Sequence, residues 1–375
     1  MKVTVTQQQL SHGLSLVSKA IAPRSTLPVL ANVLLATDEG RLRLSATNLE
    51  MGITCWIGAK IEEEGAITVP SRTFVDLVSA LPSEDVTINV EDKKQTLNIH
   101  CGKNHTDING IDAQEFPPIP MPELEEGIKL DILNFKEMIQ QVTFAASTDE
   151  ARPALQGVLL EIKDGSISMA ATDGFRISVR KIEMDGVGNQ THKMIIPARA
   201  LSEVARVAGS GDEPLVMVVP PGRGQVIFHT DEAELVSQLI DGNYPDYRAI
   251  MPNNYKTMIT FSTPAFLKAC RQSEIIAREG SNVVVLNVMQ EDGGPARVEL
   301  SAQSEETGQS EIVVDASLTG PELQIAFNVR YLREVLDIIQ TPNVVLEANA
   351  KNTPAMICPA GDNSFQHIIM PMHVS

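Results

Sequence analysis

Apolar residues recur at helical spacing in six stretches of the chain, which come in three pairs. The second stretch of each pair carries apolar side chains at i, i+3, i+4 and i+7, the pattern of an amphipathic helix packed on a flat partner. These positions are Phe74, Leu77, Val78 and Leu81, then Leu201, Val204, Ala205 and Ala208, then Leu332, Val335, Leu336 and Ile339. Leu10, Leu14 and Val17 mark the first stretch of the first pair, and Phe135, Met138, Ile139 and Val142 that of the second. The pattern predicts two helices in each third of the chain.

Two helix starts are predicted from local signals. Asn134 and Glu137 stand at the spacing of a capping box. Thr263-Pro264 reads as a cap followed by proline at the first helical position.

Between the predicted helices the hydrophobic period changes to two. Residues 86–90 and 96–99 flank a polar turn, and residues 215–219 and 225–229 flank a second turn rich in proline and glycine. Alternating runs joined by such turns are typical of antiparallel hairpins. With about eight short strands per third, the fold class is α+β, with helices gathered on one face of antiparallel sheet.

The chain contains three copies of one sequence repeat. ITVPSRTFVDLVSA from Ile67 recurs in outline as MIIPARALSEVARV from Met194 and as IAFNVRYLREVLDI from Ile325. A shift of 125 positions aligns eight identical residues between 28–47 and 153–172, where chance gives roughly one. Proline and polar residues cluster at 120–127 and 252–255, so we expect domains at 1–127, 128–254 and 255–375.

Composition and charge limit the class of protein and its cellular compartment. The net charge is −18 and 43% of residues are hydrophobic, as in a folded globular protein. No apolar run reaches the ~18 residues of a membrane span and no signal peptide opens the chain, so we expect a cytoplasmic protein. The four cysteines are scattered, which favours buried reduced thiols over disulfides or a zinc site.

Signals for catalysis are nearly absent from the sequence. It has no P-loop, GxSxG, HExxH, EF-hand loop or GxGxxG opening a helix, so neither an enzyme nor a cofactor is expected. His100 and His105 form one close pair, more typical of a surface than of a metal site. Asp173 has Asn48 as its repeat partner, which favours a turn role for its carboxylate.

Four segments together resemble one known family. Residues 26–32 (TLPVLAN), 171–176 (ATDGFR), 241–248 (DGNYPDYR) and 370–372 (MPM) occur in order on the threefold repeat. In this combination the chain resembles the bacterial sliding clamp, the β subunit of DNA polymerase III. The resemblance implies a non-catalytic processivity factor: a head-to-tail homodimeric ring, with helices lining a hole for double-stranded DNA of any sequence.

The resemblance also implies where DNA and the second chain lie. Arg24 and Arg152 match DNA-proximal loops, and Arg72, Lys136 and Arg199 are further candidates on helices, although such cations can simply solvate a helix face. An acidic chain suits a ring, because topology replaces tight phosphate binding. Thr106 and Ile108 match one side of the joint between chains, and Ile275 and Ile276 match the other. For these isoleucines, ordinary core packing is the alternative. Lys103 and His105 could face Glu299, Glu305 or Glu306 across the joint.

The family's partner site maps onto the second and third repeats. By resemblance it would bind short peptides from the DNA polymerase III α subunit, the clamp loader and other clamp-motif proteins. Flexible Met side chains in an apolar cleft suit such varied ligands. Leu155, Ile177 and Ile368 could instead be plain core residues. The matching positions are Leu155, Thr172, Gly174, Phe175, Arg176, Ile177, Pro245, Ile250, Pro354, Ile368, Met370, Pro371 and Met372.

Two other classes of function stay open on the sequence alone. One is a repeat scaffold that binds proteins but never encircles DNA. The other is an enzyme whose site is assembled from unlike repeats and leaves no motif.

Overall fold

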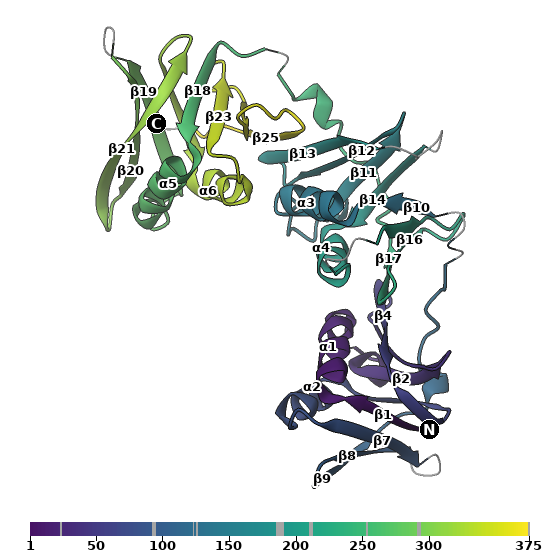
Figure 1. Ribbon diagram of the computed structural model, residues 1–375. Coiled ribbons are helices and arrows are strands. Elements are labelled where there is room, and N and C mark those ends of the chain that lie inside the picture. The colour runs from purple at the N-terminus through teal and green to yellow at the C-terminus, as the bar shows by residue number, and fades with distance from the viewer. Residues whose placement is uncertain are drawn as a thin grey trace. The chain divides into compact units, whose positions relative to one another are not determined.

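The computed structural model forms two compact units (Figure 1). One contains residues 1–136 and 200–239, and the other contains residues 137–199 and 240–375. The second repeat therefore contributes residues to both. The structure describes residues 1–22, 25–91, 95–122, 124, 127–184, 191–209, 213–252, 254–290 and 294–373.

The first unit contains two antiparallel sheets. The smaller has the order β5-β1-β7-β8-β9, so β5 and β9 are its edges. Its strands are β1 (Lys2–Thr6), β5 (Lys60–Glu63), β7 (Asp85–Glu91), β8 (Thr96–Cys101) and β9 (Asn104–Asn109). The larger has the order β10-β15-β16-β17-β4-β3-β2-β6. Its strands are β2 (Asn32–Asp38), β3 (Arg41–Thr47), β4 (Met51–Gly58), β6 (Ala66–Pro70), β10 (Ile128–Leu130), β15 (Leu215–Val218), β16 (Gln225–His229) and β17 (Ala233–Gln238).

The second unit is built on one antiparallel sheet of twelve strands, in the order β14-β11-β12-β13-β25-β24-β23-β18-β21-β20-β19-β22. Strands of the second repeat meet strands of the third where β13 pairs with β25, with Arg176 opposite Ile369. The strands are β11 (Gly157–Lys163), β12 (Ser166–Thr172), β13 (Arg176–Glu183), β14 (His192–Pro197), β18 (Thr257–Ser262), β19 (Val283–Gln290), β20 (Ala296–Ser304), β21 (Gly308–Thr319), β22 (Leu323–Asn328), β23 (Asn343–Ala348), β24 (Ala355–Pro359) and β25 (Phe365–Ile369).

Among the residues that the structure describes, the helices fall where the apolar spacing predicts them, two in each repeat. Their inward positions are buried, as Phe74, Leu201 and Leu332 illustrate at 0% exposure. In the second unit α5 lies beside α6 and packs on β20 and β21 (Figure 1). This confirms the α+β class. The helices are α1 (Gln7–Val17), α2 (Ser71–Ala80), α3 (Ile132–Thr143), α4 (Ala198–Val207), α5 (Thr263–Ala277) and α6 (Val329–Ile338), with short 3-10 turns η1 (Ser18–Ala20), η2 (Pro28–Ala31), η3 (Ala113–Glu115), η5 (Pro153–Gln156) and η6 (Tyr247–Ala249).

Both predicted helix starts are wrong by a short distance. Helix α3 begins at Ile132, and the Asp131 carboxylate, not the Asn134 side chain, accepts a hydrogen bond from the Asn134 amide at 2.8 Å. Helix α5 begins at Thr263 itself, so Ser262 is its cap residue. In both cases several adjacent polar residues could serve as caps, and tertiary packing decides which one does.

The four cysteines are buried free thiols. Burial raises the pKa of Cys55 to about 12 and that of Cys358 to about 11. No helix among the described residues is long and apolar enough to cross a membrane. The same residues contain no cluster of three or more His, Cys, Asp or Glu that could hold a metal ion.

Candidate functional site

The turn between β12 and β13, residues 172–176, is fixed by its own side chains. The Thr172 hydroxyl donates to the Arg176 carbonyl at 2.7 Å and accepts from the Gly174 amide at 3.0 Å. Asp173 Oδ1 accepts from the amides of Phe175 at 2.9 Å and Arg176 at 3.1 Å. Gly174 has φ +96°, a conformation that a side chain would strain. The result is a rigid turn that holds Phe175 in solvent, 59% exposed.

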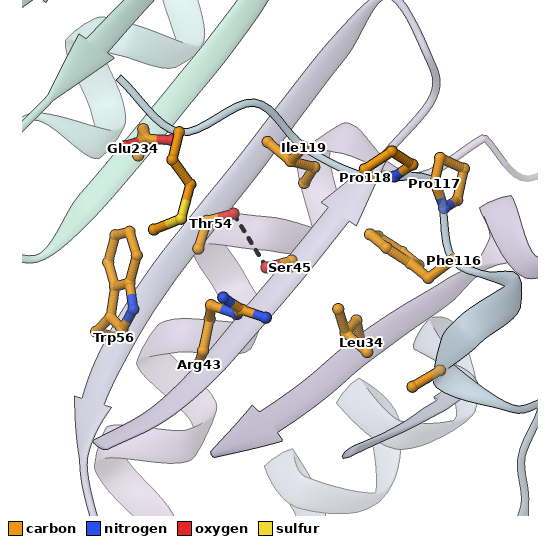
Figure 2. Close-up of a pocket in the computed structure, with 12 residues that line it drawn as sticks. Leu34, Arg43, Ser45, Thr54, Trp56, Phe116, Pro117, Pro118, Ile119 and Glu234 are labelled. Atoms are coloured by element: carbon orange, nitrogen blue, oxygen red, sulfur yellow. Dashed lines mark hydrogen bonds between the residues drawn. The ribbon is translucent and has the colours of Figure 1, made fainter. Parts of the chain in front are cut away.

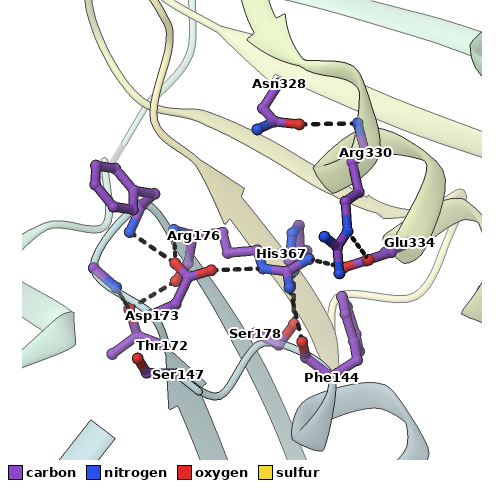
Figure 3. Close-up of polar contacts among 12 residues, drawn as sticks. Phe144, Ser147, Thr172, Asp173, Arg176, Ser178, Asn328, Arg330, Glu334 and His367 are labelled. Atoms are coloured by element: carbon purple, nitrogen blue, oxygen red, sulfur yellow. Dashed lines mark hydrogen bonds and ion pairs between the residues drawn. The ribbon is translucent and has the colours of Figure 1, made fainter. Parts of the chain in front are cut away.

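Arg176 anchors this turn to the body of the second unit (Figure 3). Its side chain is 6% exposed, and its guanidinium donates to Asp173 Oδ2 at 3.1 Å, to Glu334 Oε2 at 2.5 Å and to the Phe144 carbonyl at 2.8 Å. The guanidinium also lies 4.4 Å from the ring centre of Tyr331, within cation–π range. Arg176, expected as a peptide contact, is thus engaged by three separate elements and positions its neighbours.

The same network lowers the pKa of Glu334. Burial raises the pKa of this carboxyl, but hydrogen bonds from Arg330 and Arg176 outweigh burial and leave it below its usual value. Arg330 Nε lies 2.7 Å from Glu334 Oε1, so the carboxylate accepts from two guanidinium groups.

His367 lies on β25 near the Arg176 guanidinium and is fully buried (Figure 3). Its Nδ1 lies 2.6 Å from the Ser178 hydroxyl, and its ring stacks on Phe144 with centres 5.3 Å apart. Its Nε2 has no hydrogen-bond partner among the described residues. Burial, with the nearby charge of Arg176, holds the pKa of His367 well below the usual value, so the ring is neutral.

The chain's last described residues run alongside the turn. The Met370 amide donates to the Phe175 carbonyl at 2.9 Å, which extends the pairing of β13 with β25 by one residue. The Met372 amide donates to the Ala326 carbonyl on β22 at 2.8 Å. Met370 is 38% exposed, and Pro371 and Met372 are half-buried. The predicted Met-Pro-Met segment and the turn are therefore adjacent.

An apolar cluster lies under these residues. Ile177 and Ile368 pair across β13 and β25 and are buried in this cluster, as expected if they are ordinary core residues. Pro245 and Ile250 flank η6 and are exposed, whereas Leu155 and Pro354 are half-buried. The candidate peptide site thus combines an exposed rim (Phe175, Ile250, Met370, Pro245) with a buried apolar floor. Tyr247 and Met356, absent from the sequence-based set, belong to that floor.

The candidate DNA-facing cations have different surroundings. Arg72 and Arg199 are exposed near the starts of α2 and α4. Lys136, half-buried on α3, donates to the Gly209 carbonyl. Arg152 reaches Asp149 Oδ2 at 3.0 Å and the Asp173 carbonyl at 3.1 Å, so it braces the β12–β13 turn while 44% of its side chain stays exposed. Arg24 lies outside the described residues.

The four candidate joint residues also differ in burial. Thr106 is half-buried and Ile108 is 6% exposed on β9, where Ile108 pairs with Leu97 and packs inward. On α5, Ile276 packs against the core, whereas Ile275 is 59% exposed. Core packing thus accounts for Ile108 and Ile276 within one chain, and Ile275 is the isoleucine it leaves unexplained.

The acidic residues near the second side of the candidate joint differ in how free their carboxylates are to pair with another chain. Glu299 accepts from Asn287 Nδ2 at 3.2 Å and from Ser301 Oγ at 3.1 Å. Glu305 and Glu306 are exposed between β20 and β21. On the first side, His105 Nε2 already lies 3.1 Å from Asp107 Oδ1. Lys103 with Glu305 or Glu306 is therefore the better candidate pair.

Three α+β repeats of this topology define a clamp-type protein, and comparisons with known proteins agree. The sequence matches the N-terminal domain of the DNA polymerase III beta subunit over 1–120, its central domain over 129–246 and its C-terminal domain over 248–373. A beta sliding clamp of Synechococcus elongatus is 32% identical over 378 residues, covering 100% of both chains, and one of Staphylococcus aureus is 31% identical over 381 residues, covering 99% of both.

Solved structures give the same answer. A Bacillus subtilis DNA polymerase sliding clamp superposes with a TM-score of 0.93 at 28% identity, and a Pseudomonas aeruginosa clamp bound to griselimycin with 0.92 at 27%, each covering 100% of both chains. The chain belongs to the family of bacterial beta sliding clamps, the β subunit of DNA polymerase III.

Proposed function

We propose that this chain is the non-catalytic processivity subunit of a DNA polymerase holoenzyme. Two copies close head to tail around duplex DNA, and each tethers the polymerase III α subunit, the clamp loader or another clamp-motif protein through a short peptide. The three domains are residues 1–127, 128–254 and 255–375, in keeping with the three family matches. The observation that carries the proposal is the rigid, exposed Phe175–Met370 rim above a buried apolar floor in a chain of the clamp family.

Two unpaired strand edges support the head-to-tail joint. Strand β9 is the last strand of its sheet and pairs only with β8 among the described residues. In β21, β18 covers only residues 316–319, so residues 308–315 are paired on one side by β20 alone. Open edges are templates for pairing with another chain. Pairing of β9 with β21 of a second copy would join unlike ends, which closes a ring when the rotation is right.

The charge distribution supports topological binding. The chain carries −18 overall, and several helix cations are neutralised locally, as Arg333 is by Glu274 at 2.8 Å and by Asp337 at 2.9 Å. Tight, static phosphate binding needs many unpaired cations. A closed ring holds DNA without them, and weak contacts from Arg72, Arg152 and Arg199 leave it free to slide.

The peptide site fits a ligand with aliphatic and aromatic anchors. Exposed Phe175, Ile250 and Met370 offer apolar contacts, and Met side chains repack around different partners. A QLxLF-type peptide should bind at micromolar affinity, about −8 kcal/mol.

Light scattering and negative-stain imaging of the purified protein test this function. We expect particles with a central hole and a mass twice 40.7 kDa. Particles of one chain at micromolar concentration would contradict the ring and favour a repeat scaffold.

A further inference from the structure

The first unit contains its own copy of the β12–β13 turn, between β3 and β4. The Thr47 hydroxyl donates to the Met51 carbonyl at 3.0 Å, and Asn48 Oδ1 accepts from the amides of Glu50 at 3.0 Å and Met51 at 2.7 Å. The Gln238 amide donates to the Glu50 carbonyl at 2.8 Å. Each bond has its counterpart around the β12–β13 turn and the segment beside it. The repeat therefore builds the framework of the candidate peptide site twice.

A cavity of about 300 Å³ lies at this second location (Figure 2). Its floor is formed by Arg43, Ser45, Thr54 and Trp56 on β3 and β4, and residues 116–121 cross above it. An adjoining hollow of about 360 Å³ shares Trp56, Met121 and Glu234 as lining residues.

The floor differs in chemistry from that of the other copy. Strand register equates Ser45 with Ala170 and Thr54 with Val179, both of which belong to the apolar cluster under the candidate peptide site. Ser45 and Thr54 instead bring two hydroxyl groups 3.0 Å apart to the centre of the floor (Figure 2). The cavity therefore suits a ligand with polar groups as well as an apolar body.

Two charged groups with unused hydrogen-bonding capacity line the cavity. Glu234 is 3% exposed, and its Oε2 lies 3.3 Å from His229 Nδ1, longer than charge-assisted hydrogen bonds usually are. Arg43 Nη1 lies 3.3 Å from Asp38 Oδ2, and Arg43 Nε is buried with no partner among the described residues. The Arg43 side chain is 30% exposed, so the outer nitrogens of its guanidinium can donate to a ligand in the cavity.

We propose that this cavity binds an α-ammonium carbonyl compound with an aromatic side chain, such as an amidated aromatic amino acid or an aromatic residue at a peptide's N-terminus. The ammonium pairs with Glu234, the carbonyl oxygen accepts from the outer nitrogens of the Arg43 guanidinium, and the ring packs among Trp56, Phe116 and Ile119. This site is separate from the candidate peptide site and lies within the first unit, so it does not depend on the proposed peptide tethering.

Trp56 is the chain's one tryptophan, so its fluorescence reports on this cavity. Titration of the full-length protein with L-phenylalaninamide should give a saturable change in Trp56 emission. N-acetyl-L-phenylalaninamide lacks the ammonium and should bind about tenfold more weakly or worse, since hydrogen bonds to charged groups are the strong ones.

Glu234→Gln tests the role of the carboxylate. The substitution keeps the shape of the side chain, and it introduces the residue type that stands at the equivalent position of β25, Gln366. This variant should bind L-phenylalaninamide about tenfold more weakly and lose the preference over the acetylated probe. Glu232→Gln, which changes an exposed carboxylate on the same hairpin, should bind as the unmodified protein does. Arg43→Lys, which keeps the charge but removes the guanidinium donors, should weaken both probes.

Two results would overturn the proposal. One is the absence of a saturable change in Trp56 emission up to about 10 mM probe, which would mean a binding free energy weaker than about −3 kcal/mol. The other is equal binding by Glu234→Gln and the unmodified protein. Thermal unfolding of each variant, measured on the same samples, shows that it is folded, and peptide binding at the candidate peptide site keeps the two sites distinguishable.

Discussion

Replacing Arg176 by alanine removes the group that ties the β12–β13 turn to α6 and to the end of α3. The substitution breaks three hydrogen bonds, two of them to carboxylates, and removes the guanidinium partner of Asp173, whose side chain is 15% exposed in the unmodified protein. Breaking a buried ion pair costs about 3–5 kcal/mol, but Glu334 keeps Arg330, so we expect a loss of about 3 kcal/mol. At about 2–4 °C per kcal/mol for a unit of this size, the Tm of the second unit should fall by about 6–12 °C.

Differential scanning calorimetry of Arg176→Ala measures this loss, and Arg271→Ala is its matched control. Arg271 pairs with Asp337 at 2.6 Å in the same unit, but its side chain is 59% exposed, and such surface pairs contribute about 0–1 kcal/mol. Peptide affinity should fall in Arg176→Ala alone, because the exposed rim loses its support. If the two variants shift Tm equally, Arg176 is not the anchor described above.

Three further predictions concern the joint, the peptide rim and pH. Ile275→Lys should shift the mass measured by light scattering from that of two chains toward that of one. Leu133→Lys alters a similarly exposed apolar residue on α3 and should leave the mass unchanged. Identical masses for the two variants would count against the joint. Deletion of residues 370–375 should abolish binding of a QLxLF-type peptide by calorimetry while the ring stays dimeric, and undiminished binding would mean that the site lies elsewhere. Stability should fall as pH drops below about 6.5, because unfolded His367 takes up a proton there and folded His367, with its lowered pKa, does not. His367→Gln should flatten that slope in chemical denaturation, unlike His12→Gln at an exposed histidine, and parallel slopes would refute the assignment.

The helices, the hairpins and the threefold repeat could be predicted because each leaves a local signal. The spacing of Phe74 and Val78, or of Leu332 and Val335, indicates which face of a helix is buried. Because the unit is repeated, the same prediction applies to all three copies. Helix starts were less predictable, because Asp131 and Asn134 both offer side-chain oxygens and only packing selects between them.

The candidate site was predicted through family resemblance more than through local pattern. Phe175 and Met370 were expected at the site and are exposed, but the environment of Arg176 depends on Glu334, 158 residues away, and no spacing rule gives such a contact. Tyr247 was not predicted as part of the floor, because it is buried in a cluster with Leu159 and Ile368, which lie far away in the sequence. The polar cavity of the first unit was equally hidden, although the alignment of Thr47 with Thr172 signals that the two turns correspond.

The most direct test of the clamp function is retention on DNA of different topology. The protein is loaded onto nicked circular duplex, washed in high salt, and the circle is then linearised. We expect the protein to stay on the circle through the wash, since salt screens phosphate contacts without opening a ring, and to leave after linearisation. Equal retention on circular DNA and on linear DNA with free ends, or loss from the circle in high salt, would contradict it.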